Sequence, residues 1–370
     1  MSDALNMSRR IRRTPYTSRI EKNGVSEFTV VNHMLLPKSF QTTIEDDFWH
    51  LRSNVQIWDV SCQRQVEIFG ADAEKLLQCM TPRDISICQI GQCMYIPIID
   101  NHGGLINDPI LLKLGVNHFW LSIADSDLLL FAKGISIGMS LDVKVHEPDV
   151  SPLAIQGPKS EALLAELFGE DIRDIGYFKF GWIEFEGTRQ LISRTGYSTQ
   201  VGFEIFLNGF ELGEKLWDLI WEAGKKFNLL PGCPNLIDRI EGGLLSYGND
   251  ITRANNPLEI GLGKYCKLDG SIDYFGMENL QKIANDGVKR SIRGVLFNGD
   301  RCPTCVVPWP VLVDDRKVGQ VTSAIWSPRL EANVGISMID RDFWDHGQKI
   351  IVQMPEKKNS TGEVLDLPFE

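Results

Sequence analysis

One carboxylate interrupts an apolar alternating pattern in SRTGYSTQVGFEIFL, residues 193–207. Apolar side chains fall at every second position, on one face of an expected strand: Val201, Phe203, Ile205 and Leu207. The opposite face carries Gly202, Glu204 and Phe206. A large aromatic residue is typical of a face that is at least partly covered. The pattern therefore favours an inward-pointing Glu204 over a solvent-facing one, and it leaves open what the carboxylate binds.

Four segments combine turn glycines with polar groups: HGGLINDP, RTGYSTQVGFE, DRIEGGLLSYGNDITR and VTSAIWSPRL. Each of them alone is also typical of a turn followed by a helix cap. Arg239 and Glu241 lie two positions apart, so they would not face each other on a helix. Adjacent glycines inside a helix would each cost about 1 kcal/mol relative to alanine. Gly242 and Gly243 therefore favour close packing by another backbone or by a flat ligand.

The sequence lacks the motifs of several common enzyme classes. The chain has no Walker loop, no GxGxxG that opens a helix and no nucleophile elbow. Ser-His-Asp or Cys-His chemistry stays open, because its residues need not be adjacent in sequence. Only Cys302 and Cys305, in CPTC, have the spacing of metal ligands, and no second CxxC or HxxxH supplies the other two. The six histidines form no spaced cluster, so the sequence predicts no metal site.

Composition favours an ordinary globular protein of two or three domains. The chain has 370 residues, of which 43% are hydrophobic, and its formal net charge is −11. That acidic balance argues against nucleic acid or an anionic membrane as the main partner. No apolar run approaches the roughly 20 residues that cross a bilayer. The arginine-rich start, Arg9 to Arg19, lacks the apolar stretch of a secretory signal. We expect it to be a surface arm, with an organellar presequence as the alternative, and we expect a reduced, cytoplasmic setting.

Strands and helices alternate along most of the chain. We expect strands at 27–33 and 119–124, a helix running into a strand over 43–60, and a β-hairpin over 94–114. The same order of strand, glycine turn and helix is expected in two segments, QVEIFGADAEKLLQCM (65–80) and LAIQGPKSEALLAELFG (153–169). Two such units in succession suggest a duplicated or nested α+β architecture. Further helices are expected at 126–139 and 213–227, and short β segments from about residue 285 predict a separate all-β domain.

Taken together, the motifs resemble the aminomethyltransferase family, which includes the glycine-cleavage T-protein and related folate-dependent demethylases. The segments that carry the resemblance run in order along nearly the whole chain: RTPYTSRI, LRSNVQIWDVS, Gly103 to Asp108, Arg194 to Glu204, Arg239 to Asp250, PLEIGLGKY, YFGMENL and VGQVTSAIWSP. The resemblance implies an α+β fold of three domains around a central folate cleft: two nested ferredoxin-like units and a C-terminal β-barrel. The expected boundaries are 1–55 with 150–265 for the discontinuous folate-binding domain, 56–149 for the inserted domain, 266–284 for a linker and 285–370 for the barrel.

The resemblance also implies roles for particular residues. Glu204 would accept two N–H bonds from the polar edge of the pterin. The other expected folate-binding residues are Tyr95, Tyr197 and Arg239, and the expected catalytic acid is Asp108. Three of these residues have a structural alternative: Tyr95 as a strand core residue, Asp108 as a turn residue before Pro109, and Arg239 as the partner of a core carboxylate.

Departures from the T-protein pattern point to a different methyl donor. This chain reads GYSTQVGFE where T-proteins usually read GYTGEDGxE, and Asn107-Asp108 where they have two aspartates. The amino-acid sequence from MSRRIRRTPYTSRI onward is most similar to that of family members that demethylate dimethylsulfoniopropionate. We expect S-methyl transfer to N5 of tetrahydrofolate, giving 5-methyltetrahydrofolate and methylmercaptopropionate. Phe178 and Trp326 are the expected substrate-binding aromatics, with core packing as their alternative.

The expected reaction is redox-neutral, so tetrahydrofolate is the expected methyl acceptor, without metal, flavin or nicotinamide. The expected partners are a small-molecule substrate and folate, with no nucleic acid and no membrane, and a homodimer is left open. Three other functions stay open. They are a glycine-cleavage-type aminomethyltransferase, a demethylase of another methyl donor, and a folate-binding protein without transfer activity.

Overall fold

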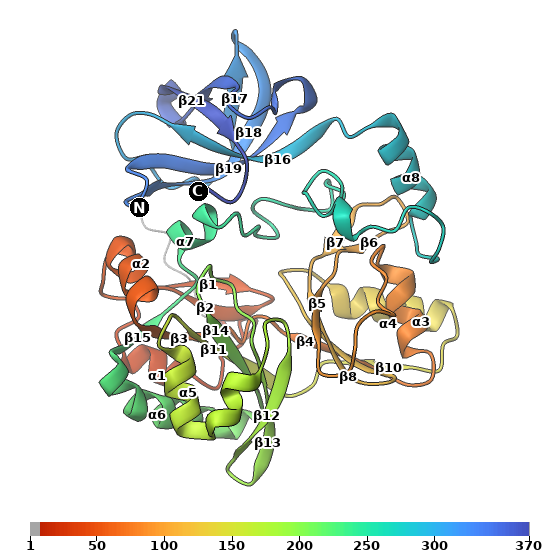
Figure 1. Cartoon of the computed structure of the whole chain (residues 1–370), viewed down its shortest axis with the longest axis vertical. Helices are drawn as coiled ribbons and strands as arrows, with labels where there is room; N and C mark the ends of the chain where they lie inside the picture. Colours follow the sequence, from red (N-terminus) through yellow and green to blue (C-terminus); the bar gives the residue numbers. More distant parts are fainter. Residues whose placement is uncertain (1–7, 370) are drawn as a thin grey trace. The chain divides into compact units, whose positions relative to one another are not determined.

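The computed structural model describes residues 8–369, and the chain separates into two compact units. The first, called here the sheet unit, comprises residues 8–76, 86–95 and 109–235. The second, called the barrel unit, comprises residues 77–85, 96–108 and 236–369. Figure 1 shows that both units mix helices with strands.

A six-stranded sheet organises the sheet unit. Its strands, in spatial order, are β12 (Phe180–Phe185), β13 (Thr188–Ser193), β14 (Gly202–Asn208), β11 (Val150–Gln156), β3 (Val55–Asp59) and β15 (Leu229–Gly232). Neighbouring strands are antiparallel except β15 and β3, which are parallel. The helices of this part are α1 (Thr17–Lys22), α2 (Ile44–Ser53), α5 (Ser160–Phe168) and α6 (Gly213–Gly224), with short 3-10 helices η1 (Glu170–Asp174), η2 (Phe210–Leu212) and η3 (Lys225–Phe227). Apolar side chains of one sheet face and of α1, α5 and α6 form one hydrophobic core.

A five-stranded sheet completes the sheet unit. Its order is β10 (Lys144–His146), β4 (Gln65–Phe69), β9 (His118–Ser122), β8 (Ile110–Gly115) and β5 (Cys93–Tyr95). The helix α4 (Leu128–Gly138) belongs to this unit, whereas α3 (Ala73–Met80) begins in it and ends in residues of the barrel unit. The strand β1 (Glu27–Val31) pairs separately with β2 (Met34–Ser39). A second apolar cluster joins the two larger sheets: Leu112 and Trp120 come from the five-stranded sheet, and Leu191 and Phe206 from the six-stranded one.

The barrel unit contains a closed β-barrel. Its strands, in order, are β16 (Arg290–Phe297), β19 (Ala332–Asp340), β18 (Arg316–Ser327), β17 (Trp309–Val313), β20 (Lys349–Gln353) and β21 (Asn359–Leu365), and β21 pairs back with β16. The other elements are β6 (Ile98–Ile99), β7 (Leu105–Asn107), α7 (Leu236–Glu241), α8 (Met277–Asp286), η4 (Gly263–Tyr265), η5 (Arg341–Phe343) and η6 (Pro355–Lys357). Valine, isoleucine, phenylalanine and tryptophan side chains fill the barrel interior.

The α+β class and the C-terminal barrel are confirmed, and both strand–glycine–helix repeats form, as β4–α3 and β11–α5. The single strand expected at 27–33 was wrong in extent. Asn32 and His33 have φ of 50° and 62°, so they turn the chain into a hairpin whose second strand is β2. The segment 266–284, expected as a linker, contains most of α8.

The glycine pair after Glu241 has a different explanation from the expected one. The helix α7 ends at Glu241, and Gly243 takes the left-handed conformation, with φ of 65°. The backbone N–H of Leu244 donates to the carbonyl of Arg239 at 2.9 Å, and that of Gly243 donates to the carbonyl of Ile240 at 3.1 Å. This is a Schellman motif, which favours glycine at the left-handed position. Gly242 and Gly243 therefore end the helix and carry no helix-interior cost.

The arginine-rich start is only partly a surface arm. Residues 1–7 lie outside the described residues, and Arg9 and Arg10 are exposed. Arg12 is exposed and pairs with Glu147 at 2.9 Å. The following residues, 14–17, are buried, and the Tyr16 hydroxyl donates to the carbonyl of Ser151 at 3.0 Å. This part of the chain is therefore packed into the sheet unit.

Candidate functional site

Glu204 lies near the centre of β14, and its side chain points away from the main hydrophobic core. Phe203, Ile205 and Leu207 belong to the core on one face of the sheet. Phe206 belongs to the second apolar cluster on the other face, which is also the face of Glu204. Glu204 is only 6% exposed. The inward-pointing carboxylate expected from the alternating pattern is therefore confirmed.

A short chain of hydroxyl groups holds the Glu204 carboxylate. Thr195 donates a hydrogen bond to Oε2, and the Ser193 hydroxyl lies within hydrogen-bonding distance of Thr195 Oγ1. Thr195 is the one hydrogen-bond partner of this carboxylate among residues 8–369. Burial raises the pKa of Glu204, and the Thr195 hydrogen bond opposes that shift. A carboxylate in this state has spare acceptor capacity for N–H donors of a ligand.

Three of the predicted aromatics, Tyr197, Phe178 and Tyr95, also lie in the sheet unit. Tyr197 is half-buried, in the segment that connects β13 to β14. Phe178 is half-buried beside the apolar cluster that contains Phe206. It has φ of 56°, and its carbonyl accepts a hydrogen bond from the N–H of Cys93 at 2.8 Å. Tyr95, half-buried at the end of β5, belongs to the same unit.

Asp108 follows the β6–β7 hairpin of the barrel unit, where it is half-buried. The hairpin turns at 100–104, where Asp100 Oδ1 accepts hydrogen bonds from the backbone N–H groups of residues 102 and 104 at 2.8 and 2.9 Å. A side-chain carbon added to Gly104 would lie 2.8 Å from the carbonyl oxygen of Arg253, so the turn leaves no room for one. The turn expected from HGGLINDP is therefore confirmed, and it places Asp108 just after the second strand of the hairpin.

Tyr247 is an ionisable group close to Asp108 that the sequence did not single out. Its hydroxyl donates a hydrogen bond to the carbonyl of Leu105 at 2.9 Å. Burial raises the pKa of Tyr247 to about 12; Arg253 opposes the shift, and the carboxylates of Asp108 and Asp100 add to it. A neutral phenol beside Asp108 helps to fix the end of the hairpin.

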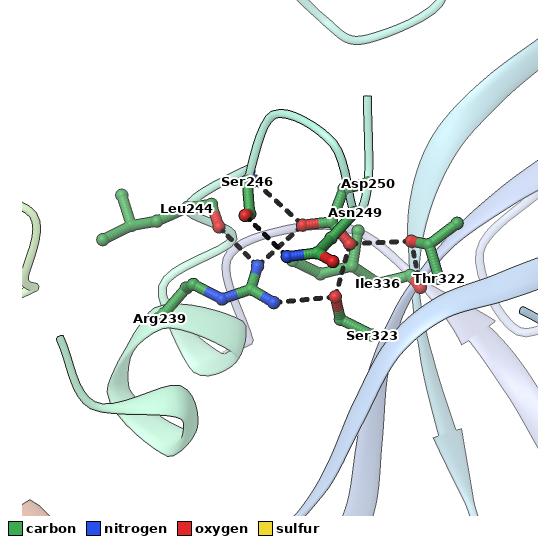
Figure 2. A network of polar contacts seen from close by, with 8 residues as sticks. All are labelled: Arg239, Leu244, Ser246, Asn249, Asp250, Thr322, Ser323 and Ile336. Carbon is green, nitrogen blue, oxygen red and sulfur yellow. Dashed lines mark hydrogen bonds and ion pairs between the residues drawn. The ribbon is translucent and has the colours of Figure 1, made fainter. Parts of the chain in front are cut away.

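Arg239, on α7, is the centre of a buried polar network (Figure 2). Its Nη1 lies 2.7 Å from Asp250 Oδ2 and donates to the carbonyl of Leu244 at 3.0 Å. Its Nη2 donates to Ser323 Oγ at 2.7 Å. The side chains of Arg239 and Asp250 are 8% and 0% exposed. The ion pair with a core carboxylate, considered as an alternative above, is therefore present, and a folate-binding role for Arg239 stays a prediction.

Asp250 has all of its oxygens occupied. Oδ2 accepts from Arg239 and from the backbone N–H of Ser246 at 2.9 Å. Oδ1 accepts from the hydroxyls of Thr322 and Ser323 at 2.7 and 2.6 Å (Figure 2). These two hydroxyls belong to β18, so the network ties the YGND loop to a barrel strand.

Trp326, the last of the predicted residues, lies further along β18. It is half-buried, and the Arg301 guanidinium carbon lies 5.5 Å from the centre of its ring. Close by, the buried Glu241 pairs with Arg329 at 2.6 Å. Arg239 and Glu241 thus have different partners, as their spacing of two positions predicted.

The structure distributes the predicted residues over both units. Tyr95, Phe178, Tyr197 and Glu204 belong to the sheet unit, and Asp108, Arg239 and Trp326 to the barrel unit. The polar partners that hold them were missed: Gln156, Thr195, Tyr247 and Asp250. Gln156 carried a weak signal, because a polar side chain ends the apolar strand at 153–156. Thr195 and Tyr247 carried none that separates them from ordinary turn residues.

Two searches of the described residues were negative. Within residues 8–369, no group of three or more His, Cys, Asp or Glu side chains is placed to hold a metal ion. In the same part of the chain, no helix is both long enough and apolar enough to cross a membrane. The eight cysteines are free thiols, and burial raises the pKa of Cys302 to about 11 and that of Cys305 to about 12.

Comparison with known proteins identifies the family. Residues 16–270 match the GCVT N-terminal domain, and residues 290–369 match the glycine cleavage T-protein C-terminal barrel domain. The chain therefore belongs to the glycine cleavage T-protein family, and the resemblance seen in its motifs is confirmed.

Particular relatives narrow the comparison. The dimethylsulfoniopropionate demethylase DmdA of Ruegeria pomeroyi is 48% identical over 349 residues, which cover 94% of this chain and 95% of the relative. An aminomethyltransferase of Bacillus cytotoxicus is 30% identical over 340 residues, which cover 90% and 91%. The crystal structure of the glycine cleavage system aminomethyltransferase T from Bartonella henselae aligns with a TM-score of 0.86 at 20% identity, covering 97% of this chain and 98% of that one. This last likeness supports the fold.

Proposed function

We propose that this chain is a methyltransferase that demethylates dimethylsulfoniopropionate. It moves one S-methyl group to N5 of tetrahydrofolate and releases methylmercaptopropionate. The observation that carries the proposal is the 48% identity, over 94% of the chain, with a dimethylsulfoniopropionate demethylase. Two aminomethyltransferases that also match are 30% and 31% identical. The difference favours S-methyl transfer over transfer of an aminomethyl group.

The residues of the sheet unit suit a pterin. The polar edge of a pterin presents N–H donors, and Glu204 is a buried carboxylate with a single hydroxyl partner among the described residues. Charge-assisted hydrogen bonds from a ligand would compensate the carboxylate for the water that it has lost. In this proposal Glu204 holds the pterin and Tyr95 and Tyr197 line its site. Arg239 stays a proposed folate-binding residue.

Tetrahydrofolate supplies a neutral amine nitrogen as methyl acceptor. The chain's own contribution is to hold donor and acceptor in line, which is worth up to about 7–11 kcal/mol in ideal cases. Phe178 and Trp326 are the proposed contacts of the sulfonium, because an aromatic face attracts a cation by about 0.5–2 kcal/mol. The accepting amine loses one proton for each methyl group it gains. Asp108 is the proposed acceptor of that proton, directly or through a water molecule.

The reaction as written leaves every oxidation level unchanged, so the proposal includes no flavin, nicotinamide or metal. We also propose a cytoplasmic location, with small molecules as partners in place of nucleic acid or membrane. The net charge of −11 supports this choice of partners, and eight free thiols suit a reducing compartment. The domain boundaries expected from the sequence are part of the same proposal, and a homodimer stays open.

Product analysis tests the proposal. Purified protein is incubated anaerobically with tetrahydrofolate and dimethylsulfoniopropionate, and the products are separated by mass. We expect 5-methyltetrahydrofolate and methylmercaptopropionate in equal amounts. Bound tetrahydrofolate without either product would contradict the proposal and favour an amine donor or a folate-binding protein without transfer activity.

The variant Asp108→Asn tests the proton acceptor. It keeps the shape of the side chain and removes its basicity, so we expect kcat to fall by about 100-fold, the lower part of the range for general-base catalysis. Tetrahydrofolate affinity should stay near that of the wild type. Wild-type turnover by this variant would exclude Asp108 as the base.

A further inference from the structure

Gln156, the last residue of β11, is completely buried and lies outside the set of predicted site residues. Its side-chain amide makes three hydrogen bonds, all with the segment 195–203, which comprises most of the connection from β13 to β14 and the first two residues of β14. Nε2 donates to the carbonyls of Thr195 and Phe203, each at 3.3 Å. Oε1 accepts from the hydroxyl of Ser198 at 2.7 Å. One buried amide therefore joins the beginning, the middle and the end of this segment.

Two glycines of the segment make room for the amide. A side-chain carbon at Gly196 or at Gly202 would overlap the Gln156 amide group. Neither glycine has a positive φ, so close approach explains their presence better than backbone conformation does. Because Gln156 has no exposed surface, it has little freedom to move aside. The spacing GYSTQVG is thus matched to the glutamine on the neighbouring strand.

The segment contains Tyr197 and borders Glu204, two of the residues assigned to the pterin. Thr195, whose hydroxyl holds the Glu204 carboxylate, is bonded to Gln156 through its own carbonyl. Tyr197 lies between Thr195 and Ser198, and Glu204 directly follows Phe203. Fixing both ends of the segment therefore fixes Thr195 relative to Glu204 and limits the positions open to Tyr197.

We propose that Gln156 is a positioning residue for the folate site: its amide orders the segment 195–203 so that Thr195, Tyr197 and Glu204 are preorganised for the pterin. This inference rests on the proposed function for its ligand. The ordering of the segment rests on the hydrogen bonds alone. Preorganisation increases affinity because the ligand does not have to order the segment on binding.

Gln190 offers a matched control. It is also a completely buried glutamine in the same sheet, on β13, and its amide also makes three hydrogen bonds. Nε2 donates to Thr188 Oγ1 at 2.8 Å and to the carbonyl of Asn208 at 3.2 Å, and Oε1 accepts from the N–H of Asn208 at 2.7 Å. These bonds hold the far end of β14 and leave 195–203 untouched.

The experiment compares Gln156→Ala with Gln190→Ala in the full chain. Amide hydrogen exchange is measured over 195–203, and tetrahydrofolate affinity is measured anaerobically at a temperature where both variants stay folded. We expect Gln156→Ala to raise exchange in this segment, and to weaken tetrahydrofolate binding, each by about tenfold or more, since three hydrogen bonds are lost. KM for tetrahydrofolate should rise while kcat at saturating tetrahydrofolate stays within about twofold. Gln190→Ala should leave exchange in 195–203 and tetrahydrofolate affinity unchanged.

Several results would overturn the inference. Unchanged exchange over 195–203 in Gln156→Ala would show that the amide does not order the segment. Equal losses of affinity in the two variants would show a general effect of losing a buried amide. If Gln156→Ala does not fold, Ser198→Ala removes one of the three bonds from a half-buried position, and the same two readouts decide. If the wild type binds no tetrahydrofolate, the proposed function and the ligand part of this inference fail, while hydrogen exchange still decides the ordering role.

Discussion

Two of the buried carboxylates, one in each unit, have very different surroundings. Asp250, in the barrel unit, accepts hydrogen bonds from Arg239, from the backbone of Ser246 and from two hydroxyls of β18. Glu204, in the sheet unit, accepts one, from Thr195, among the described residues. Burying a charge without enough hydrogen-bond donors costs free energy. A buried carboxylate with one donor, such as Glu204, therefore destabilises the fold unless a ligand supplies further donors.

The difference separates a structural role from a binding role. Every lone-pair direction of Asp250 is in use, so a ligand would have to break existing bonds to reach it. Glu204 keeps most of its acceptor capacity, and burial raises its pKa. We therefore infer that Asp250 stabilises the barrel unit and that Glu204 is kept for N–H groups of a ligand.

The largest expected effect is on stability, in Asp250→Asn. The substitution preserves the shape of the side chain and leaves the buried Arg239 guanidinium without its counter-charge, which costs about 3–5 kcal/mol. Urea unfolding at neutral pH measures this loss. Glu204→Gln is the control, because a neutral amide in that position no longer carries the desolvation cost of a charge. We expect it to change the free energy of unfolding by less than about 1 kcal/mol, or to raise it. Equal losses in the two variants would remove the distinction.

The next largest effect is on tetrahydrofolate affinity, where Glu204→Gln is the damaging variant. Glu204→Gln exchanges a charged acceptor with two oxygens for a neutral amide whose NH2 group faces the ligand's N–H donors as another donor. We therefore expect tetrahydrofolate binding to weaken by about 1.5–3 kcal/mol, or roughly 10- to 150-fold. Equilibrium titration under anaerobic conditions measures it. Gln190→Ala, which changes a buried side chain of the same sheet, is the control and should leave the affinity unchanged. Unchanged affinity in Glu204→Gln would end the pterin assignment.

The strand and the orientation of Glu204 could be predicted from the sequence. The period-two pattern around Glu204 predicted the strand, its two faces and the inward carboxylate, because alternation is a local property of β-strands. The β-rich segment after residue 285 predicted an all-β domain for the same reason, and the family resemblance implied that this domain is a barrel. The glycine pair after Glu241 was wrongly placed inside a helix, because the end of a helix can be located from sequence only to within one or two residues.

The partners could not be predicted, because they depend on register between distant segments. Asp250 meets Thr322 and Ser323 across more than seventy residues, and only the folded barrel brings them together. Gln156 reaches Thr195 in the same way, from a strand that lies nearly forty residues earlier. Residue types alone do not distinguish a buried glutamine that holds a loop from one that, like Gln190, holds the end of a neighbouring strand.

A smaller effect is expected on binding of the methyl donor, and it can be tested with one aromatic residue from each unit. Phe178 lies in the sheet unit with Glu204, and Trp326 lies on the same barrel strand as Thr322 and Ser323. Replacing an aromatic ring that faces the sulfonium with leucine should cost about 0.5–2 kcal/mol of donor binding. Steady-state kinetics should therefore show KM for dimethylsulfoniopropionate raised by about 2- to 30-fold in Phe178→Leu and in Trp326→Leu. A variant that leaves this KM unchanged identifies a ring that only packs.

The smallest expected effect is a pH dependence that belongs to Glu204. Because burial raises its pKa above the ordinary value of 4.5, the folded chain keeps this proton at pH values where the unfolded chain has lost it. The free energy of unfolding is therefore highest below about pH 4.5, falls as pH rises through the raised pKa, and is level above it. Glu204→Gln removes this contribution. Asp59, whose pKa burial raises to about 6, contributes to both proteins and cancels in their difference.

Urea unfolding of the wild type and of Glu204→Gln at a series of pH values measures the difference. We expect the wild type to lose stability relative to the variant as pH rises from about 4.5, and Thr195→Val to extend the loss to higher pH, because the Thr195 hydrogen bond lowers the pKa of Glu204. Tetrahydrofolate should reduce the wild-type loss, since its N–H donors favour the ionised carboxylate. Parallel curves for wild type and Glu204→Gln would show that the carboxylate is already as well satisfied as Asp250, and the contrast between the two units would then disappear.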